Sequence, residues 1–443
     1  MKTPIIDFVK KYALSSSVRL HMPGHKGVSF FGVEKWDITE ITGADVLYSA
    51  KGVIKESEMN ATSLFDSGRT LYSTEGSSLS IRAMLHLVKT YALANGKSAK
   101  VIAGRNAHKT FVSASALLDI DVKWLYSTEN GVLSCKTHLS TLENAILEEN
   151  PTAVYITSPD YLGGVEDVKS IAEICHKHGV LLLVDNAHGG YLKFISEGDH
   201  PLDLGADLVC DSAHKTLPAL TGAGYLHIGK TAPDFFKDNA ENALSLYAST
   251  SPSYLILQSL DNLNRVLSSH PDYFKKTVAK VDELKDLLIG AGHTLVGDEK
   301  MKITISTKPY GYEGNYFADL LEEKGIVVEF ADRDFVTMMF SPCNKSGDFK
   351  KTAKAILSIE RKQPILDAPP ASPVLERGMT MHSALFAPSE EVAVDKAIGR
   401  ILATPTVSCP PAIPIAVCGE VIDEKAVEVF KYYRINTILV VKE

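Results

Sequence analysis

The sequence has few cysteines and no long apolar run. No run of 18 apolar residues occurs, so we expect no membrane-spanning helix. The first residues, Met-Lys-Thr-Pro-Ile-Ile-Asp, lack the long apolar core of a signal peptide. No Cys-x-x-Cys pair is present, and we therefore expect reduced thiols of a cytoplasmic protein rather than a disulfide framework or a zinc site. The six cysteines are scattered over positions 135, 175, 210, 343, 409 and 418.

The chain also has no excess of basic residues. It carries 46 Lys and Arg against 54 Asp and Glu, a net charge of −8. Such a surface argues against nucleic acid and anionic membrane as partners, and it is compatible with a cationic substrate. An apolar content of 45% with 23% charged residues is ordinary for a globular protein. A chain of 443 residues can form two or three domains with a large core.

Apolar strand-like segments alternate with helical segments between residues 61 and 260. This alternation predicts an α/β fold with a mostly parallel sheet and crossover helices. The expected strands are 101–102, 122–125, 153–157, 180–184, 207–210 and 223–228. The expected helices are 77–94, 109–118, 139–149 and 165–178.

We predict four domains along the chain. Residues 1–60 form an N-terminal arm with a short helix near 5–13, and 61–295 form the large domain with a long helix near 274–288. Residues 296–362 form a smaller α/β domain, with strands at 302–306, 326–330 and 336–340 and a helix at 349–359. Residues 363–443 form a C-terminal unit that begins with a proline-rich linker at 363–373, with a helix opening at Ser389 and a strand at 437–441.

Two motifs suggest a site for pyridoxal phosphate. Asp185 follows the apolar run Val180–Val184, so it emerges at the carboxyl end of a buried strand, where α/β sheets bind ligands. Lys215 lies in Asp-Ser-Ala-His-Lys-Thr-Leu-Pro, beginning at Asp211. A lysine amine can form a Schiff base with the cofactor aldehyde, and a carboxylate keeps the pyridine nitrogen protonated. A buried ion pair between Asp185 and Lys215 explains these two residues equally well.

Two further segments fit such a site but have ordinary alternatives. Gly76 permits a tight turn before a helix, where the amides of Ser77 and Ser78 suit a phosphate group. A simple serine N-cap explains this loop too and is favoured for the loop alone. His108 follows the strand at 101–103, where its ring could stack on the pyridine or serve as a hydrogen-bonded loop histidine.

Histidine pairs do not indicate a metal site. His21 and His25 are four residues apart, but Pro23 and Gly24 lie between them and exclude a regular helix. His188 follows Asp185 at a spacing that could bind a metal, yet no third acid or histidine stands in register. We therefore predict no metal.

The order of phosphate loop, ring-stacking residue, aspartate and lysine is that of fold-type I pyridoxal phosphate enzymes. More narrowly, the chain resembles the bacterial ornithine/lysine/arginine decarboxylase family in its short form, without the N-terminal receiver-like domain. The resembling segments are 21–27 (HMPGHKG), 39–45 (TEITGAD), 68–70 (GRT), 105–109 (RNAHK), 185–189 (DNAHG), 212–218 (SAHKTLP), 250–254 (TSPSY), 410–414 (PPAIP) and 419–420 (GE).

The resemblance implies α-decarboxylation of arginine, lysine or ornithine to an amine that feeds polyamine synthesis. Lys215 would hold the cofactor, Asp185 would protonate its ring, and His108 and Ala187 would pack on the two ring faces. The remaining cofactor contacts would come from Gly76, Ser77, Ser78, His188, Ser212 and His214. Thr250 and Ser251 would reach the phosphate of a partner subunit, which makes the expected assembly a homodimer with shared sites. Glu420 is our candidate for the distal cationic group of the substrate, and a surface carboxylate that caps a turn is the equal alternative.

Three positions depart from the family pattern. Glu75 replaces an Asn in the phosphate loop, Asn186 replaces a Glu after the aspartate, and Ala412 replaces a Gly. None removes a group that the cofactor chemistry requires. An aminotransferase or lyase of the same fold, or an inactive cofactor-binding protein, remains the alternative. The late arginines, at 361, 377, 400 and 434, stand in no motif for a substrate carboxylate.

Overall fold

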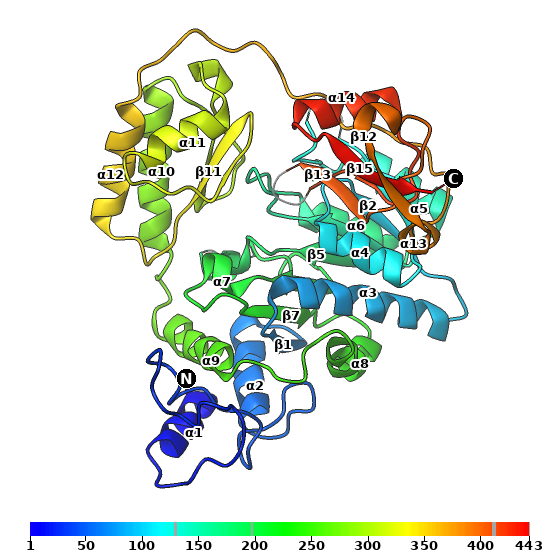
Figure 1. Ribbon diagram of the computed structural model, residues 1–443. Helices are drawn as coiled ribbons and strands as arrows, with labels where there is room; N and C mark the ends of the chain where they lie inside the picture. The colour runs from blue at the N-terminus through cyan, green and yellow to red at the C-terminus, as the bar shows by residue number, and fades with distance from the viewer. Residues whose placement is uncertain (128–130, 196–197, 410–412, 443) are drawn as a thin grey trace. The chain divides into compact units, whose positions relative to one another are not determined.

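The computed structural model describes residues 1–127, 131–195, 198–409 and 413–442, and Figure 1 traces its helices and strands. The chain divides into two units. Unit 1 comprises Met1–Tyr91 and Leu181–Tyr273, and unit 2 comprises Ala92–Val180 and Phe274–Glu443. The four domains expected from the sequence stay a prediction. Residues 410–412 of the late proline motif, including Ala412, lie outside the described residues.

The sheet of unit 1 runs in the order β1 (Arg69–Ser73), β7 (Gly224–Ile228), β6 (Leu208–Asp211) and β5 (Leu181–Asp185). Strands β5 and β6 are parallel, with Leu183 opposite Leu208, whereas β7 is antiparallel to both β6 and β1. All residues of β5 are buried, as the continuous apolar run predicts. Because β5 and β6 are parallel, Asp185 and Asp211 emerge at the same edge of the sheet.

The helices of unit 1 are α1 (Pro4–Ala13), α2 (Val53–Phe65), α3 (Gly76–Ala94), α7 (Ala213–Thr216), α8 (Asp234–Ser245) and α9 (Tyr254–Ser269). Helices α1, α2 and α9 pack against one another. Helix α2 is not among the helices expected from the sequence, which placed only one short helix in the N-terminal arm. Its start is fixed from outside the helix, because the Asp45 carboxylate accepts hydrogen bonds from the amides of Gly52 and Ile54 at 2.7 and 3.1 Å.

Unit 2 contains a parallel three-stranded segment in the order β4 (Ala153–Thr157), β2 (Lys100–Gly104) and β3 (Asp121–Leu125). Its helices α4 (Lys109–Leu117), α5 (Leu139–Glu149) and α6 (Val168–Lys177) alternate with the strands as predicted. With β5 and β6 of unit 1, these pairings make the central strands mostly parallel. The expectation of an α/β fold is therefore confirmed.

A second sheet in unit 2 is antiparallel, in the order β10 (Phe330–Ala331), β11 (Phe335–Met339), β9 (Lys302–Ser306) and β8 (Thr294–Val296). Helices α10 (Lys275–Gly290), α11 (Gly314–Glu322) and α12 (Ser346–Leu357) lie on one side of it (Figure 1) and share its apolar core. The strand expected at 326–330 is wrong except for Phe330. Val327 is 84% exposed, and Ile326 and Val328 are only partly buried against the apolar core.

The last part of unit 2 holds α13 (Met381–Phe386), α14 (Glu424–Tyr432) and two antiparallel strand pairs. The pairs are β12 (Ser389–Ala393) with β15 (Thr437–Val441), and β13 (Thr406–Cys409) with β14 (Ile413–Val417). The helix expected at Ser389 is wrong, because this segment pairs with the terminal strand and places Glu391 opposite Leu439. Among the residues that the structure describes, no helix is long and apolar enough to cross a bilayer.

Candidate active site

The candidate site begins at the carboxyl end of β5. Asp185 is 3% exposed, and its Oδ1 accepts hydrogen bonds from the Ala187 amide at 3.2 Å and from the Cys210 thiol at 3.5 Å. The turn after β5 thus holds the carboxylate at a fixed place on the strand edge. Burial, together with the charges of Asp185 and Asp211, raises the pKa of the Cys210 thiol, so this thiol stays protonated.

Lys215 lies in α7, one short turn after β6. Its Nζ is 2.9 Å from Nε2 of His188, which is itself buried in the turn that follows Asp185. The lysine amine and the buried carboxylate therefore belong to the ends of two paired strands, β5 and β6. The imidazole gives the amine a polar partner within hydrogen-bond distance.

The predicted phosphate loop precedes α3. Gly76 has a φ of +66°, and its amide donates to the Gly222 carbonyl at 2.7 Å. The Ser212 hydroxyl donates to the Ser77 hydroxyl at 2.8 Å, so α7 and the start of α3 present their hydroxyls together. His214 Nδ1 lies 2.9 Å from the Ala223 carbonyl and holds α7 against the start of β7. A helix N-terminus with two adjacent hydroxyls is a donor set that suits a phosphate.

Glu75 is exposed and binds backbone. Its Oε1 accepts a hydrogen bond from the Ser249 amide at 2.7 Å. Thr250 and Ser251, the next residues, are both exposed in this chain. The substitution of Asn by Glu therefore connects the phosphate loop to the segment that carries Thr250 and Ser251.

His108 and Glu420 lie in unit 2. His108 caps α4, where its Nδ1 accepts from the Thr110 amide at 3.2 Å, and its ring-stacking role stays a prediction. Glu420 is 4% exposed, and both of its oxygens pair with Arg105, at 2.8 and 2.7 Å. The alternative of a surface carboxylate at Glu420 is therefore wrong in its location, although Oε2 also accepts a hydrogen bond from the Val417 amide at 2.9 Å, as a carboxylate that caps a turn does. The Arg105 guanidinium also lies over the rings of Trp124 and Tyr126. Because Arg105 pairs with Glu420, the Glu420 carboxylate already has a cationic partner.

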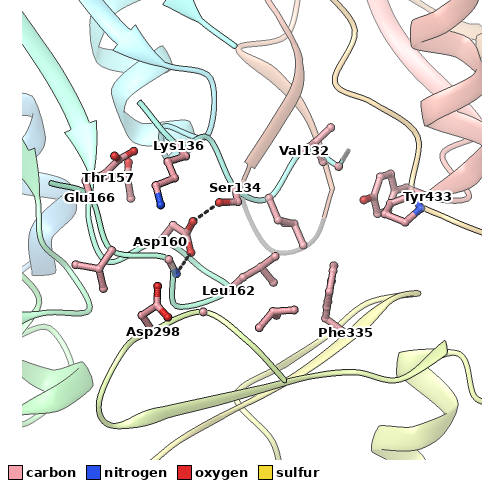
Figure 2. A pocket seen from close by; sticks show the side chains of 17 residues that line it. Val132, Ser134, Lys136, Thr157, Asp160, Leu162, Glu166, Asp298, Phe335 and Tyr433 are labelled. Carbon is pink, nitrogen blue, oxygen red and sulfur yellow. Dashed lines mark hydrogen bonds between the residues drawn. The ribbon is translucent and has the colours of Figure 1, made fainter. Parts of the chain in front are cut away.

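A cavity of about 370 Å³ lies within unit 2 (Figure 2). Three carboxylates, Asp160, Glu166 and Asp298, line it with Lys136. Asp160 is tied down by the Ser134 hydroxyl at 2.6 Å and the Gly164 amide at 2.7 Å (Figure 2). Burial raises the pKa of Glu166 to about 7 against the hydrogen bonds from Thr137. None of the site residues expected from the sequence lines this cavity.

Comparison with known proteins decides the family. The model described as "Orn/Lys/Arg decarboxylase, major domain" matches residues 3–289, and the one described as "Orn/Lys/Arg decarboxylase, C-terminal domain" matches residues 370–439. The chain belongs to the Orn/Lys/Arg decarboxylase family. The family named from the sequence motifs is thereby confirmed.

Individual relatives agree over nearly the whole chain. The chain is 30% identical to an arginine decarboxylase of Bacillus subtilis, over 97% of this chain and 93% of that protein. It is 28% identical to an arginine decarboxylase of Halalkalibacterium halodurans, over 96% and 91% of the two chains. The structure of a Francisella novicida lysine decarboxylase shares the fold, with a TM-score of 0.81 at 17% identity over 99% of this chain and 81% of that one.

Membership of this family makes the protein a pyridoxal phosphate-dependent amino-acid decarboxylase of fold type I. The described residues of unit 1 fit that cofactor. They offer a buried carboxylate at Asp185, an amine at Lys215 and paired hydroxyls at Ser77 and Ser212 beside the start of a helix. When bound, pyridoxal phosphate supplies a ring that accepts the electron pair left behind as carbon dioxide departs.

Proposed function

We propose that arginine is the preferred substrate among the basic amino acids. The observation that carries this proposal is the name of the relatives: the two curated proteins described above, which align over at least 96% of this chain, are arginine decarboxylases. The amine product would feed polyamine synthesis. The six cysteines are all free thiols, which supports a cytoplasmic location.

The proposed roles in unit 1 follow from its geometry. Lys215 is the point at which the cofactor attaches, and His188 holds its amine in place. Asp185 holds a proton on the ring nitrogen of the cofactor, because a buried carboxylate stabilises a cation beside it. Ala187 follows directly in the same turn and would pack on one ring face, with His108 of unit 2 as the proposed partner on the other.

We assign the phosphate group to the start of α3. The amides and hydroxyls of Ser77 and Ser78 would donate to it, with the Ser212 hydroxyl and His214 completing the set. The positive φ of Gly76 favours glycine at the turn. A Cβ on Gly224 would lie 2.8 Å from the carbonyl carbon of Gly76, so glycine at the start of β7 is what lets the loop approach the sheet.

The proposed active assembly is a homodimer with shared sites. The N-terminal arm exposes large apolar side chains, among them Leu20 at 88%, Phe30 at 82% and Phe31 at 87%. An apolar surface of this kind marks an interface. Thr250 and Ser251 are exposed on the same unit and would contact the phosphate bound by the partner subunit.

A substrate panel tests the proposal. Enzyme loaded with pyridoxal phosphate would be assayed with arginine, lysine and ornithine, with the amine product identified by mass spectrometry. We expect kcat/KM for arginine to exceed the others by about tenfold, which is about 1.4 kcal/mol of differential transition-state binding. A higher kcat/KM for lysine or ornithine would refute the assignment of arginine. Formation of a keto acid instead of an amine would favour an aminotransferase.

A further inference from the structure

A buried network surrounds Asp211, the last residue of β6. Its Oδ2 lies 3.1 Å from Nε2 of both His200 and His227, and its Oδ1 accepts from the Asn186 amide group at 2.7 Å. These four side chains are fully enclosed. Burial opposes ionisation of Asp211, but the two histidines that hydrogen-bond to it lower its pKa well below the usual range.

Two histidines and an aspartate within 4.8 Å of one another could also hold a metal ion. The hydrogen bonds of His200 favour a different assignment. The Leu202 amide donates to Nδ1 of His200 at 3.3 Å, an arrangement that favours the tautomer with the ring proton on Nε2. A protonated Nε2 donates to Asp211 and has no lone pair for a metal. The Nδ1 of His227 lies 2.8 Å from the Thr70 hydroxyl, which can donate to it and so leave the ring proton on Nε2 as well.

Asn186 and Asp211 form a complementary pair. A Glu side chain at 186 would bring a second carboxylate to Asp211, and two adjacent buried carboxylates cannot both ionise. The amide at 186 instead donates a hydrogen bond, so Asn at 186 suits an aspartate at 211.

We propose that Asp211 is a positioning residue for the cofactor site and that Asn186 is its required neutral partner. Through Asn186 the Asp211 carboxylate fixes the turn that begins with Asp185. Through its own backbone it fixes the segment from Ser212 to Lys215. This inference rests on the proposed roles of Asp185 and Lys215. The titratable groups around the pair are Asp185, His200, Cys210, Tyr225 and His227.

The test compares Asn186→Glu with Asn186→Gln, which differ in charge and hardly in size. The affinity of the apoprotein for pyridoxal phosphate would be measured by fluorescence titration at pH 6 and pH 8. For Asn186→Glu we expect a Kd about tenfold above wild type at pH 8 and a smaller change at pH 6, where the two carboxylates share a proton. For Asn186→Gln we expect a change below about threefold at both pH values, because the amide donor is retained.

The double variant Asn186→Glu/Asp211→Asn exchanges the two kinds of side chain, so the pair again consists of one carboxylate and one amide. We expect this double variant to bind the cofactor within about threefold of wild type, although each single change weakens binding about tenfold. Asp203→Asn, which removes an exposed charge that pairs with Lys193, is the matched control and should behave as wild type.

Equal behaviour of the Glu and Gln variants at both pH values, or no rescue in the double variant, would overturn the proposal. The zinc content of the wild type and of Asp211→Asn tests the hydrogen-bond assignment. About one equivalent of zinc per chain in the wild type that is lost in the variant would overturn it. Thermal unfolding separates this proposal from the proposed function. It is measured on the apo forms of the wild type, Asn186→Glu, Asp211→Asn and the double variant. Coupling between 186 and 211 must appear there even if Asp185 and Lys215 prove to have other roles.

Discussion

The Nζ atom of Lys215 and Nε2 of His188 lie 2.9 Å apart, although the two residues follow different strands. His188 belongs to the turn that begins at Asp185, and Lys215 belongs to the helix that follows β6. The parallel pairing of β5 and β6 therefore brings the amine to the same edge of the sheet as the buried carboxylate. A fold-type I decarboxylase needs both groups there.

Asp185→Asn should bind pyridoxal phosphate but lose most activity. The neutral amide cannot hold the proton on the ring nitrogen, and an unprotonated ring accepts electrons poorly. We expect kcat to fall by about a hundredfold or more, with cofactor affinity and melting temperature close to wild type. Steady-state kinetics and a cofactor titration measure the two effects separately. Near-normal turnover would mean that another group holds this proton.

Two inactive variants should complement each other if the sites are shared. One carries Lys215→Ala, and the other carries disruptive changes at Thr250 and Ser251. A two-fold interface repeats each contact, so their heterodimer contains one site with both halves intact and up to about half of wild-type activity. Subunit exchange would be followed with a tagged chain. Exchange without any rescue, or a fully active monomer on a sizing column, would contradict the shared site.

Glu420→Gln should destabilise unit 2, because Arg105 would keep its charge in a buried place without a carboxylate partner. Breaking a buried ion pair in this way costs about 3 to 5 kcal/mol. Urea unfolding measures the loss, and Glu428→Gln, which changes an exposed carboxylate on α14 of the same unit, is the control. The KM of the folded variant decides whether Glu420 also binds substrate. A tenfold rise in KM with unchanged stability would support the substrate role and contradict the structural one.

The stability of unit 1 should fall between about pH 4.5 and pH 7 because of Glu58. Burial raises the pKa of this side chain to about 7, against the hydrogen bond from the Tyr72 amide. The neutral form is thus favoured in the folded state. Its contribution to the free energy of unfolding is fully present below the pKa that Glu58 has in the unfolded chain, and it is lost as the pH rises through 7.

Glu58→Gln should remove that pH dependence. The free energy of unfolding attributed to Glu58 in the wild type falls by at most about 3 kcal/mol between pH 5 and pH 8, and the variant should not show this fall. Thermal and urea unfolding at the two pH values provide the comparison. The control is the exposed residue Glu56, replaced by Gln in the same helix. An unchanged pH profile in Glu58→Gln would show that this carboxyl is ionised in the folded protein.

The sequence was informative wherever one segment carried its own signal. The apolar run before Asp185 predicted a buried strand and a site at its end, and Gly76 predicted the turn before α3. It was silent where partners come from distant segments. Nothing in the spacing connects His200 or His227 with Asp211, or Arg105 with Glu420, because each pair meets only after the strands have assembled. The helix expected at Ser389 failed for the same reason, since the pairing with β15 outweighs a local helix signal.

We propose that Lys215 and its neighbours carry the decarboxylation of a basic amino acid. The most direct test supplies carboxyl-labelled arginine, lysine and ornithine to the holoenzyme and to Lys215→Ala, and measures labelled carbon dioxide together with the amine. The account predicts equal amounts of both products from the wild type. It predicts neither product, and no visible absorbance of lysine-bound cofactor, from the variant. Labelled carbon dioxide released by Lys215→Ala, or a keto acid that retains the label in the wild type, would contradict it.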